Sequence, residues 1–303
     1  MSAHVVGIDG GGTRSRGVLL DSTGSELARA EGGPARATAS HPEDAAQAVA
    51  GVVTDLLTQA GSREEPLGFV WAGLTGAGRE ESRRAVEQEL GRLGLASHVR
   101  VDTDVAVAFH DAFGHGPGIL LIAGTGSIAW GRTENGRIGR VGGWGHHIGD
   151  EGSGYAIGLE ALRRVARHAD GRAPETALGR SVLAHSGVGD VDGIVSWSAE
   201  ASKADVASLA KVVAQAAQAG DTVAEEILAH AVEDLESHVL AILTNLGPWP
   251  EPPRLALGGG LLEPGGSLRE PLQAALERQL LDVVDTTPDG AVGAARLALA
   301  ALS

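Results

Sequence analysis

The sequence predicts an α/β protein built from two similar lobes, and three observations support this. A run of three strands followed by alternating helices and strands occurs twice along the 303 residues. Each copy opens on a hairpin whose glycine-rich turn carries Thr and Ser, DGGGTRS in the first and AGTGS in the second. The length suits two domains of ordinary size. We therefore expect a duplication of topology, with the two turns facing each other across an interdomain cleft.

The first copy has the order βββαβαβα. Three short apolar runs separated by turns predict a meander, and apolar residues at helical spacing alternate with buried strands after it. The strands are expected at HVVGID (4–9), RGVLLD (16–21), SELARAEGG (25–33), 66–74 and 98–104, and the helices at 42–61, 79–94 and from 105 onward.

The second copy repeats this order with helices inserted. GILLIAG, IAWGR and RIGRVGGWG are its expected strands, with an Asn-Gly hairpin turn in TENG (133–136). Helices are expected near 153–170, 175–186, 203–219 and 221–246, followed by a strand at 254–260, a helix, a strand at 281–287 and a closing helix at 289–302. The lobes are then 1–116, with the C-terminal helix 289–303 packing back onto it, and 117–288 with a helical insertion.

Composition excludes several classes of site. The chain has no cysteine, which excludes disulfides, thiolate zinc sites, Cys-ligated iron–sulfur clusters and a Cys nucleophile. A net charge of −15 argues against nucleic-acid or anionic-membrane partners. No apolar stretch reaches spanning length, and MSAHVVGID lacks the features of a signal peptide, so we expect a cytoplasmic protein.

The glycine turns are the first candidate for chemistry. Without Cβ atoms a phosphate chain can lie against backbone N–H groups, and neighbouring hydroxyls add donors. Neither G-x-G-x-x-G nor a P-loop lysine fits residues 7–17. Asp9, at a strand end, can hold Mg²⁺ through water. The phosphate candidates are Gly11, Gly12, Thr13, Ser15, Gly124, Thr125, Gly126 and Ser127, and a third run, Gly258, Gly259 and Gly260, is a candidate base and ribose site. For each turn the alternative is a plain structural bend.

Five segments in order resemble one known family: IDGGGTRS, VDTDVAVA, IAGTGSIAWGR, GGWGHHIGDEGSGYAIG and LALGGGLLEPG. They are similar to the N-acetylglucosamine kinase and benzoyl-CoA-reductase-activating ATPase family, within the superfamily of sugar kinases, actin and chaperone ATPases. The resemblance covers nearly the whole chain and implies two actin/ribonuclease-H-like lobes that bind ATP and Mg²⁺. One branch of the family carries cluster-binding cysteines, which this chain lacks. The other phosphorylates the 6-hydroxyl of amino sugars.

The resemblance also implies roles for individual residues. Asp104 is the expected catalytic base, with Asp102 as the rival and helix capping as the structural alternative. Strand alternation would place the two carboxylates on one face. Asp150 is expected to contact the sugar together with Gly143 and Thr125. Where the resembling kinases often have Gly-Pro-(Ser/Ala)-Asn, with the Asn on the sugar, this chain reads Gly33-Pro34-Ala35-Arg36.

A zinc site at His146, His147, Asp150 and Glu151 is disfavoured, because adjacent histidines point apart and the i, i+4 spacing is missing. We expect an ATP-dependent kinase of an amino sugar, with N-acetylglucosamine as first choice and glucosamine or another hexose as alternatives. A non-catalytic, nucleotide-dependent sugar sensor is the alternative from another class. By resemblance, we expect a homodimer, with the helix-rich block as its interface.

Overall fold

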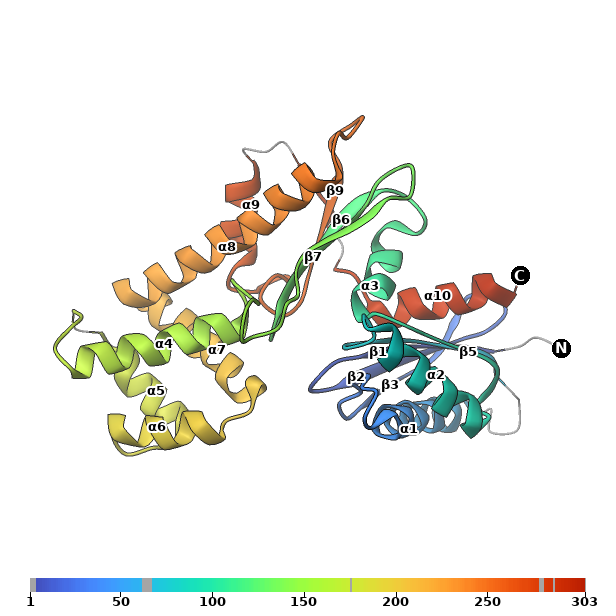
Figure 1. Cartoon of the computed structure of the whole chain (residues 1–303), viewed down its shortest axis with the longest axis horizontal. Helices are drawn as coiled ribbons and strands as arrows, with labels where there is room; N and C mark the ends of the chain where they lie inside the picture. Colours follow the sequence, from blue (N-terminus) through green and yellow to red (C-terminus); the bar gives the residue numbers. More distant parts are fainter. Residues whose placement is uncertain (1–3, 62–66, 175, 278–280, 286, 303) are drawn as a thin grey trace. The chain divides into compact units, whose positions relative to one another are not determined.

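The computed structural model describes residues 4–61, 67–174, 176–277, 281–285 and 287–302 (Figure 1). The chain divides into two compact units, Met1–His115 with Pro288–Ser303, and Gly116–Thr287. Each unit holds a five-stranded mixed sheet. The strand orders, β3-β2-β1-β4-β5 and β8-β7-β6-β9-β10, are equivalent position by position. The predicted duplicated α/β fold is therefore confirmed.

The first unit follows the expected order of elements. In its sheet β2 runs antiparallel to β1 and β3, while β4 runs parallel to β1 and β5. Its elements are β1 (Val5–Gly10), β2 (Ser15–Leu20), β3 (Glu26–Gly32), α1 (Pro42–Ala60), β4 (Leu67–Leu74), α2 (Glu80–Leu93), β5 (Ala96–Asp102), α3 (Asp104–Phe113) and α10 (Gly290–Leu302).

Alternation along β1 divides the first unit's core between the two faces of the sheet. Val6 and Ile8 are buried in the cluster that includes residues of α1 and α2, while Val5 is buried with residues of α10. Figure 1 shows α1 and α2 on one side of this sheet and α3 and α10 on the other. A Cβ added at Gly7 would lie 2.1 Å from the Ala295 nitrogen, so the glycine lets α10 approach β1 at backbone distance.

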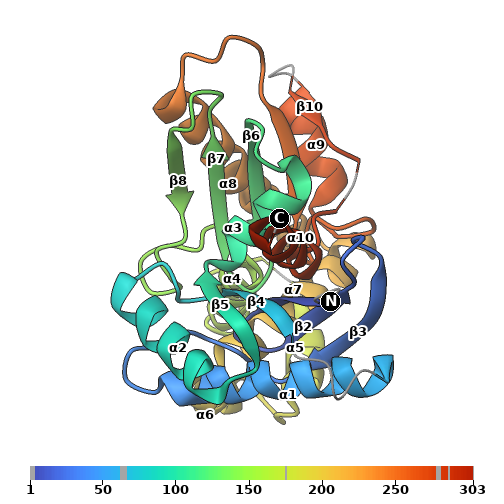
Figure 2. The same ribbon diagram turned by 90° about the vertical axis from the view of Figure 1, so that its right-hand side faces the viewer.

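The second unit repeats the sheet and adds a block of helices. Figure 2 shows β6, β7 and β8 side by side with α8 behind them, and α8 contacts all three strands. The elements are β6 (Gly118–Ala123), β7 (Ser127–Arg132), β8 (Ile138–Gly142), α4 (Gly154–Ala169), α5 (Leu178–Ser186), α6 (Val191–Glu200), α7 (Lys203–Gln218), α8 (Thr222–Leu246), β9 (Arg254–Gly258), α9 (Arg269–Glu277) and β10 (Asp282–Val283).

Three local features differ from the expectations. Helix α6 was not expected, because VDGIVSWSAE holds a glycine, two serines and three β-branched residues, all weak helix formers. Strand β8 ends at Gly142, whose positive φ of 73° turns the chain out of the sheet. Asp104 lies in the first turn of α3 and not on a strand, so strand alternation does not relate it to Asp102. None of the described helices is both long and apolar enough to cross a membrane.

Candidate functional site

The glycine turn of the first unit connects β1 to β2. The Gly11 N–H donates to the Arg14 carbonyl at 2.9 Å and closes the turn. At Gly12 the backbone does not have positive φ, and an added Cβ would meet no described atom within 4 Å. Gly12 and Thr13 are exposed. Neither backbone conformation nor packing requires glycine at position 12, so the open space over this turn is available to a ligand.

Ser15 has a structural role that the sequence did not reveal. Its side chain is fully buried, and its hydroxyl donates to the Gly33 carbonyl at 2.8 Å. The hydroxyl therefore ties the segment that follows β3 to the start of β2. Ser15 was expected to donate to phosphate, and this geometry directs its only proton elsewhere.

Ser127 occupies the equivalent position in the second unit and does the same. It begins β7, is 2% exposed, and donates to the Glu151 carbonyl at 2.6 Å. Glu151 belongs to the segment after β8, as Gly33 belongs to the segment after β3. The two units thus share an equivalent hydrogen bond from this serine to the loop that follows their third strand. Ser15 and Ser127, which were expected to donate to phosphate, instead anchor these loops. By contrast, Thr13 is exposed and Thr125 is half-buried.

The glycines of the second unit divide into structural and open positions. Gly259 has a φ of 85°, and an added Cβ would lie 2.5 Å from the Ala123 carbonyl oxygen. A Cβ at Gly126 would lie 3.0 Å from the Asp150 carboxylate. At Gly260 an added Cβ meets nothing within 4 Å, and at Gly124 only the Gly260 nitrogen at 4.0 Å. Gly258 ends β9, paired with Ile122. Gly124 and Gly260 thus lie next to each other, and the positions that their side chains would occupy are empty.

Asp9 lies near the end of β1 with its side chain 19% exposed. One carboxylate oxygen accepts from Arg16 at 2.8 Å. Burial raises the pKa of the Asp9 carboxyl, more than the Arg16 contact lowers it, and the nearby charges of Asp104 and Asp289 add to the rise. A Cβ at Gly290 would lie 2.8 Å from the Asp9 carboxyl carbon, so the missing side chain there makes room for the carboxylate.

Asp104 is the first residue of α3 and lies two residues after the end of β5. Thr103 caps this helix by accepting from the Ala106 N–H, so the capping alternative for Asp104 is not what the structure shows. Instead, the Asp104 carboxylate accepts from the Thr75 hydroxyl at 2.5 Å and from the Val105 N–H at 2.9 Å. Burial raises the pKa of the Asp104 carboxyl, and these hydrogen bonds lower it by less.

The rival carboxylate, Asp102, is held differently. Its side chain accepts from the Thr103 N–H at 2.8 Å, at the last position of β5. Asp9, Thr75 and Asp104 lie at the carboxyl ends of β1, β4 and β5, which are parallel neighbours. In open α/β sheets this edge is where ligands bind.

Asp150 is the only described non-glycine residue with positive φ, at 62°. Such a conformation costs on the order of 1 kcal/mol or more and persists where the surroundings fix it. The carboxylate is 4% exposed and accepts from the Lys203 ammonium at 2.7 Å. Sequence analysis missed Lys203, which lies 53 residues away at the start of α7. The chain has only two lysines, Lys203 and Lys211, and that rarity is the signal that could have singled it out.

The segment between β8 and α4 carries further exposed groups beside Asp150. Gly143 has a φ of 68°, which favours glycine. Trp144 is 62% exposed, and the Arg140 guanidinium lies 4.6 Å from its ring centre. His146 contacts the Tyr155 ring edge-on. No group of three or more potential metal ligands occurs within the described part of the chain.

Comparisons with known proteins agree with one another. The model of the BadF/BadG/BcrA/BcrD ATPase family matches residues 6–298. An N-acetyl-D-glucosamine kinase of Dictyostelium discoideum is 32% identical over 310 residues, covering 97% of each chain. An N-acetylmuramic acid/N-acetylglucosamine kinase of Clostridium acetobutylicum is 31% identical over 261 residues, covering 86% of this chain and 85% of the relative. The crystal structure of a putative N-acetylglucosamine kinase from Chromobacterium violaceum is 32% identical, with a TM-score of 0.83 over 98% of this chain and 99% of that one.

Proposed function

Because the chain belongs to the BadF/BadG/BcrA/BcrD ATPase family, we propose that it transfers the terminal phosphoryl group of ATP to the 6-hydroxyl of an amino sugar, giving the sugar 6-phosphate. Its relatives named as N-acetylglucosamine kinases align along most or all of the chain. The first-choice acceptor is N-acetylglucosamine.

The phosphates of ATP lie over the glycine turns in this proposal. Gly12 supports it for the first unit, because the space beside it is open and the fold does not require glycine there. Thr13, which is exposed, and Thr125, which is half-buried, supply hydroxyls, and Gly124 and Gly260 leave similar room in the second unit. Successive N–H groups in such turns bind anions. The adenosine is assigned to the turn after β9.

Asp9 fits the role of a Mg²⁺ ligand. Its carboxylate is partly exposed at the strand edge, and its Oδ2 contacts Arg16. Mg²⁺ is commonly bound through one or two carboxylates, water and substrate phosphates, which agrees with the absence of a cluster of three ligands among the described residues. When bound, the ion would neutralise charge on the phosphates.

Asp104 is the proposed general base. A carboxylate with raised pKa is better matched to accepting a hydroxyl proton near neutral pH than an ordinary aspartate. The sugar O6 forms a bond to the γ-phosphorus while the bond from that phosphorus to the β,γ-bridging oxygen breaks. The proton of the 6-hydroxyl passes to Asp104, and ADP leaves. The Thr75 hydroxyl holds the carboxylate in one orientation.

In the second unit, Asp150 and its loop are proposed to hold the sugar. The carboxylate accepts hydrogen bonds from sugar hydroxyls, the Lys203 ammonium holds it in place, and Gly143 with Thr125 provides neighbouring polar groups. The exposed Trp144 ring adds an apolar face of the kind against which sugar rings pack.

The observation that carries the proposal is the placement of Asp104, half-buried and hydrogen-bonded to Thr75 at the carboxyl edge of the sheet, in a chain of an ATPase family. The test is ADP release from ATP and Mg²⁺ with a panel of hexoses and hexosamines, with the product's phosphate position assigned by ³¹P–¹H NMR. Sugar-dependent ADP release with a 6-phosphate product is expected. ADP release that no sugar accelerates would refute the kinase and favour a nucleotide-dependent sensor.

A further inference from the structure

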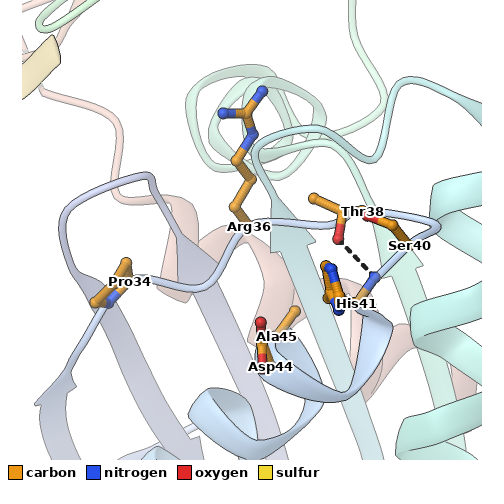
Figure 3. A pocket seen from close by; sticks show the side chains of 7 residues that line it. All are labelled: Pro34, Arg36, Thr38, Ser40, His41, Asp44 and Ala45. Carbon is orange, nitrogen blue, oxygen red and sulfur yellow. Dashed lines mark hydrogen bonds between the residues drawn. The ribbon is translucent and has the colours of Figure 1, made fainter. Parts of the chain in front are cut away.

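A pocket lies in the first unit, between the segment that follows β3 and the first turn of α1. Its volume is about 270 Å³. Figure 3 shows its lining residues, Pro34, Arg36, Thr38, Ser40, His41, Asp44 and Ala45. The Thr38 hydroxyl accepts from the His41 N–H at 3.3 Å and shapes the bend before α1.

Arg36 is the strongest charge of this pocket. Figure 3 shows its side chain extending away from the His41 ring and from Asp44 on α1. The residue is exposed, and its guanidinium makes no ion pair with any residue in the described ranges. Two arginines of the neighbouring sheet are paired, Arg16 with Asp9 and Arg29 with Asp289. The chain has a net charge of −15, so acidic side chains are plentiful. The lack of an ion pair at Arg36 is therefore not explained by a lack of carboxylates.

The backbone places Arg36 next to the proposed base. Arg36 forms an isolated parallel bridge with Thr75, and the Ala37 N–H donates to the Thr75 carbonyl at 2.9 Å. The Thr75 hydroxyl in turn donates to Asp104. Gly76 has a φ of 90°, and a Cβ added there would lie 2.4 Å from the Ala37 carbonyl oxygen. The close approach of the segment that holds Arg36 therefore depends on glycine at position 76.

We propose that Arg36 is a specificity-determining residue that selects amino sugars bearing a carboxylate substituent. This inference rests on the proposed function, because it places the sugar at Asp104. A planar guanidinium with free N–H groups matches a carboxylate in a two-hydrogen-bond arrangement. The hydroxyls of Thr38 and Ser40 line the same pocket and provide further donors. Asp44, the one acid among the lining residues, disfavours the same ligand from the α1 side.

The experiment compares two sugars that differ by one anionic group. N-acetylmuramic acid is N-acetylglucosamine with a lactic acid ether on O3. Arg36→Gln should raise KM for N-acetylmuramic acid so that kcat/KM falls about ten- to hundredfold, the range for a lost hydrogen bond to a charged group. The kcat/KM for N-acetylglucosamine should stay within about threefold. Arg36→Lys should keep part of the preference, because it keeps the charge without the planar fork. Asp44→Asn should lower KM for the acidic sugar.

Arg180→Gln is the matched control. Arg180 is exposed on α5, and its substitution removes the same charge from the second unit. An Arg36→Gln variant that loses both sugars equally, or a wild-type enzyme that ignores N-acetylmuramic acid while phosphorylating N-acetylglucosamine, overturns the inference and leaves the kinase intact. If no sugar of the hexose and hexosamine panel is phosphorylated, the proposed function fails. In that case a rise in melting temperature with N-acetylmuramic acid alone, abolished by Arg36→Gln, still supports carboxylate binding at Arg36. If the wild-type protein shows no such rise, carboxylate binding is refuted as well.

Discussion

Replacing Gly12 with alanine should weaken nucleotide binding without lowering the stability of the fold. An added Cβ at this position meets no described atom within 4 Å, and the backbone is not in the left-handed region. Stability should therefore hold or rise by about 0.4–1 kcal/mol, because alanine restricts the unfolded chain. That corresponds to a melting temperature higher by about 1–4 °C. If phosphate lies on this turn, the methyl group displaces it from one or two backbone N–H groups. KM for ATP and Kd for ADP should then rise about ten- to hundredfold.

Differential scanning fluorimetry and titration calorimetry with ADP measure the two effects on the same preparations. Gly7→Ala is the control with the opposite pattern. Its Cβ would lie 2.1 Å from the Ala295 nitrogen and 2.2 Å from the Ala291 carbonyl oxygen, so β1 and α10 must move apart. Overpacking of this kind costs about 1–3 kcal/mol or more. A Gly12→Ala protein that keeps wild-type affinity for ADP would refute the assignment of the first turn to phosphate.

The remaining predictions concern the two carboxylates. Asp104→Asn should lower kcat by about 10²–10⁴ while Kd for ADP stays near wild type, measured by coupled ADP release and calorimetry; unchanged turnover would exclude Asp104 as the base. Removing the Thr75 hydroxyl with Thr75→Val takes away a hydrogen bond that lowers the pKa of Asp104, so the acid limb of the kcat/KM profile should move to higher pH; a limb that stays or moves down contradicts this. Lys203→Met should destabilise the fold by about 1–3 kcal/mol in urea unfolding, since it leaves the Asp150 carboxylate buried without its cation, and adding Asp150→Asn should recover part of that loss. Equal stability of the Lys203→Met protein would show that the ion pair is unimportant.

Local patterns predicted most of the fold. Val5, Val6 and Ile8 alternate between two faces, and the helices have apolar residues at regular spacing, so strands and helices follow from periods of two and 3.6. The repeated hairpin also predicted the equivalence of the two sheets. Helix α6 was missed because its residues have weak helical propensity, and its buried Ile194 makes it part of the second unit's core.

The site was less accessible to sequence reasoning, because side-chain partners come from distant segments. Ser15 and Ser127 look like phosphate donors beside glycine turns, yet each hydroxyl is used by a carbonyl 18 or 24 residues away. Lys203 reaches Asp150 across 53 residues. Periodicity carries no information on such pairs, whereas the open space at Gly12 and the raised pKa of Asp104 become visible only once the neighbours are placed.

The close seating of α10 on β1 has a consequence for synthesis on the ribosome. Residues 290–302 complete the first unit's apolar core, yet they emerge only after the whole of the second unit has been made. During synthesis, Val5, Val18 and Leu20 of the N-terminal sheet therefore stay uncovered until α10 has emerged. Residues Gly116–Thr287 form a continuous stretch and can fold before that. Premature termination just before α10 should yield chains whose second unit is native and whose first unit is a target for chaperones and proteases.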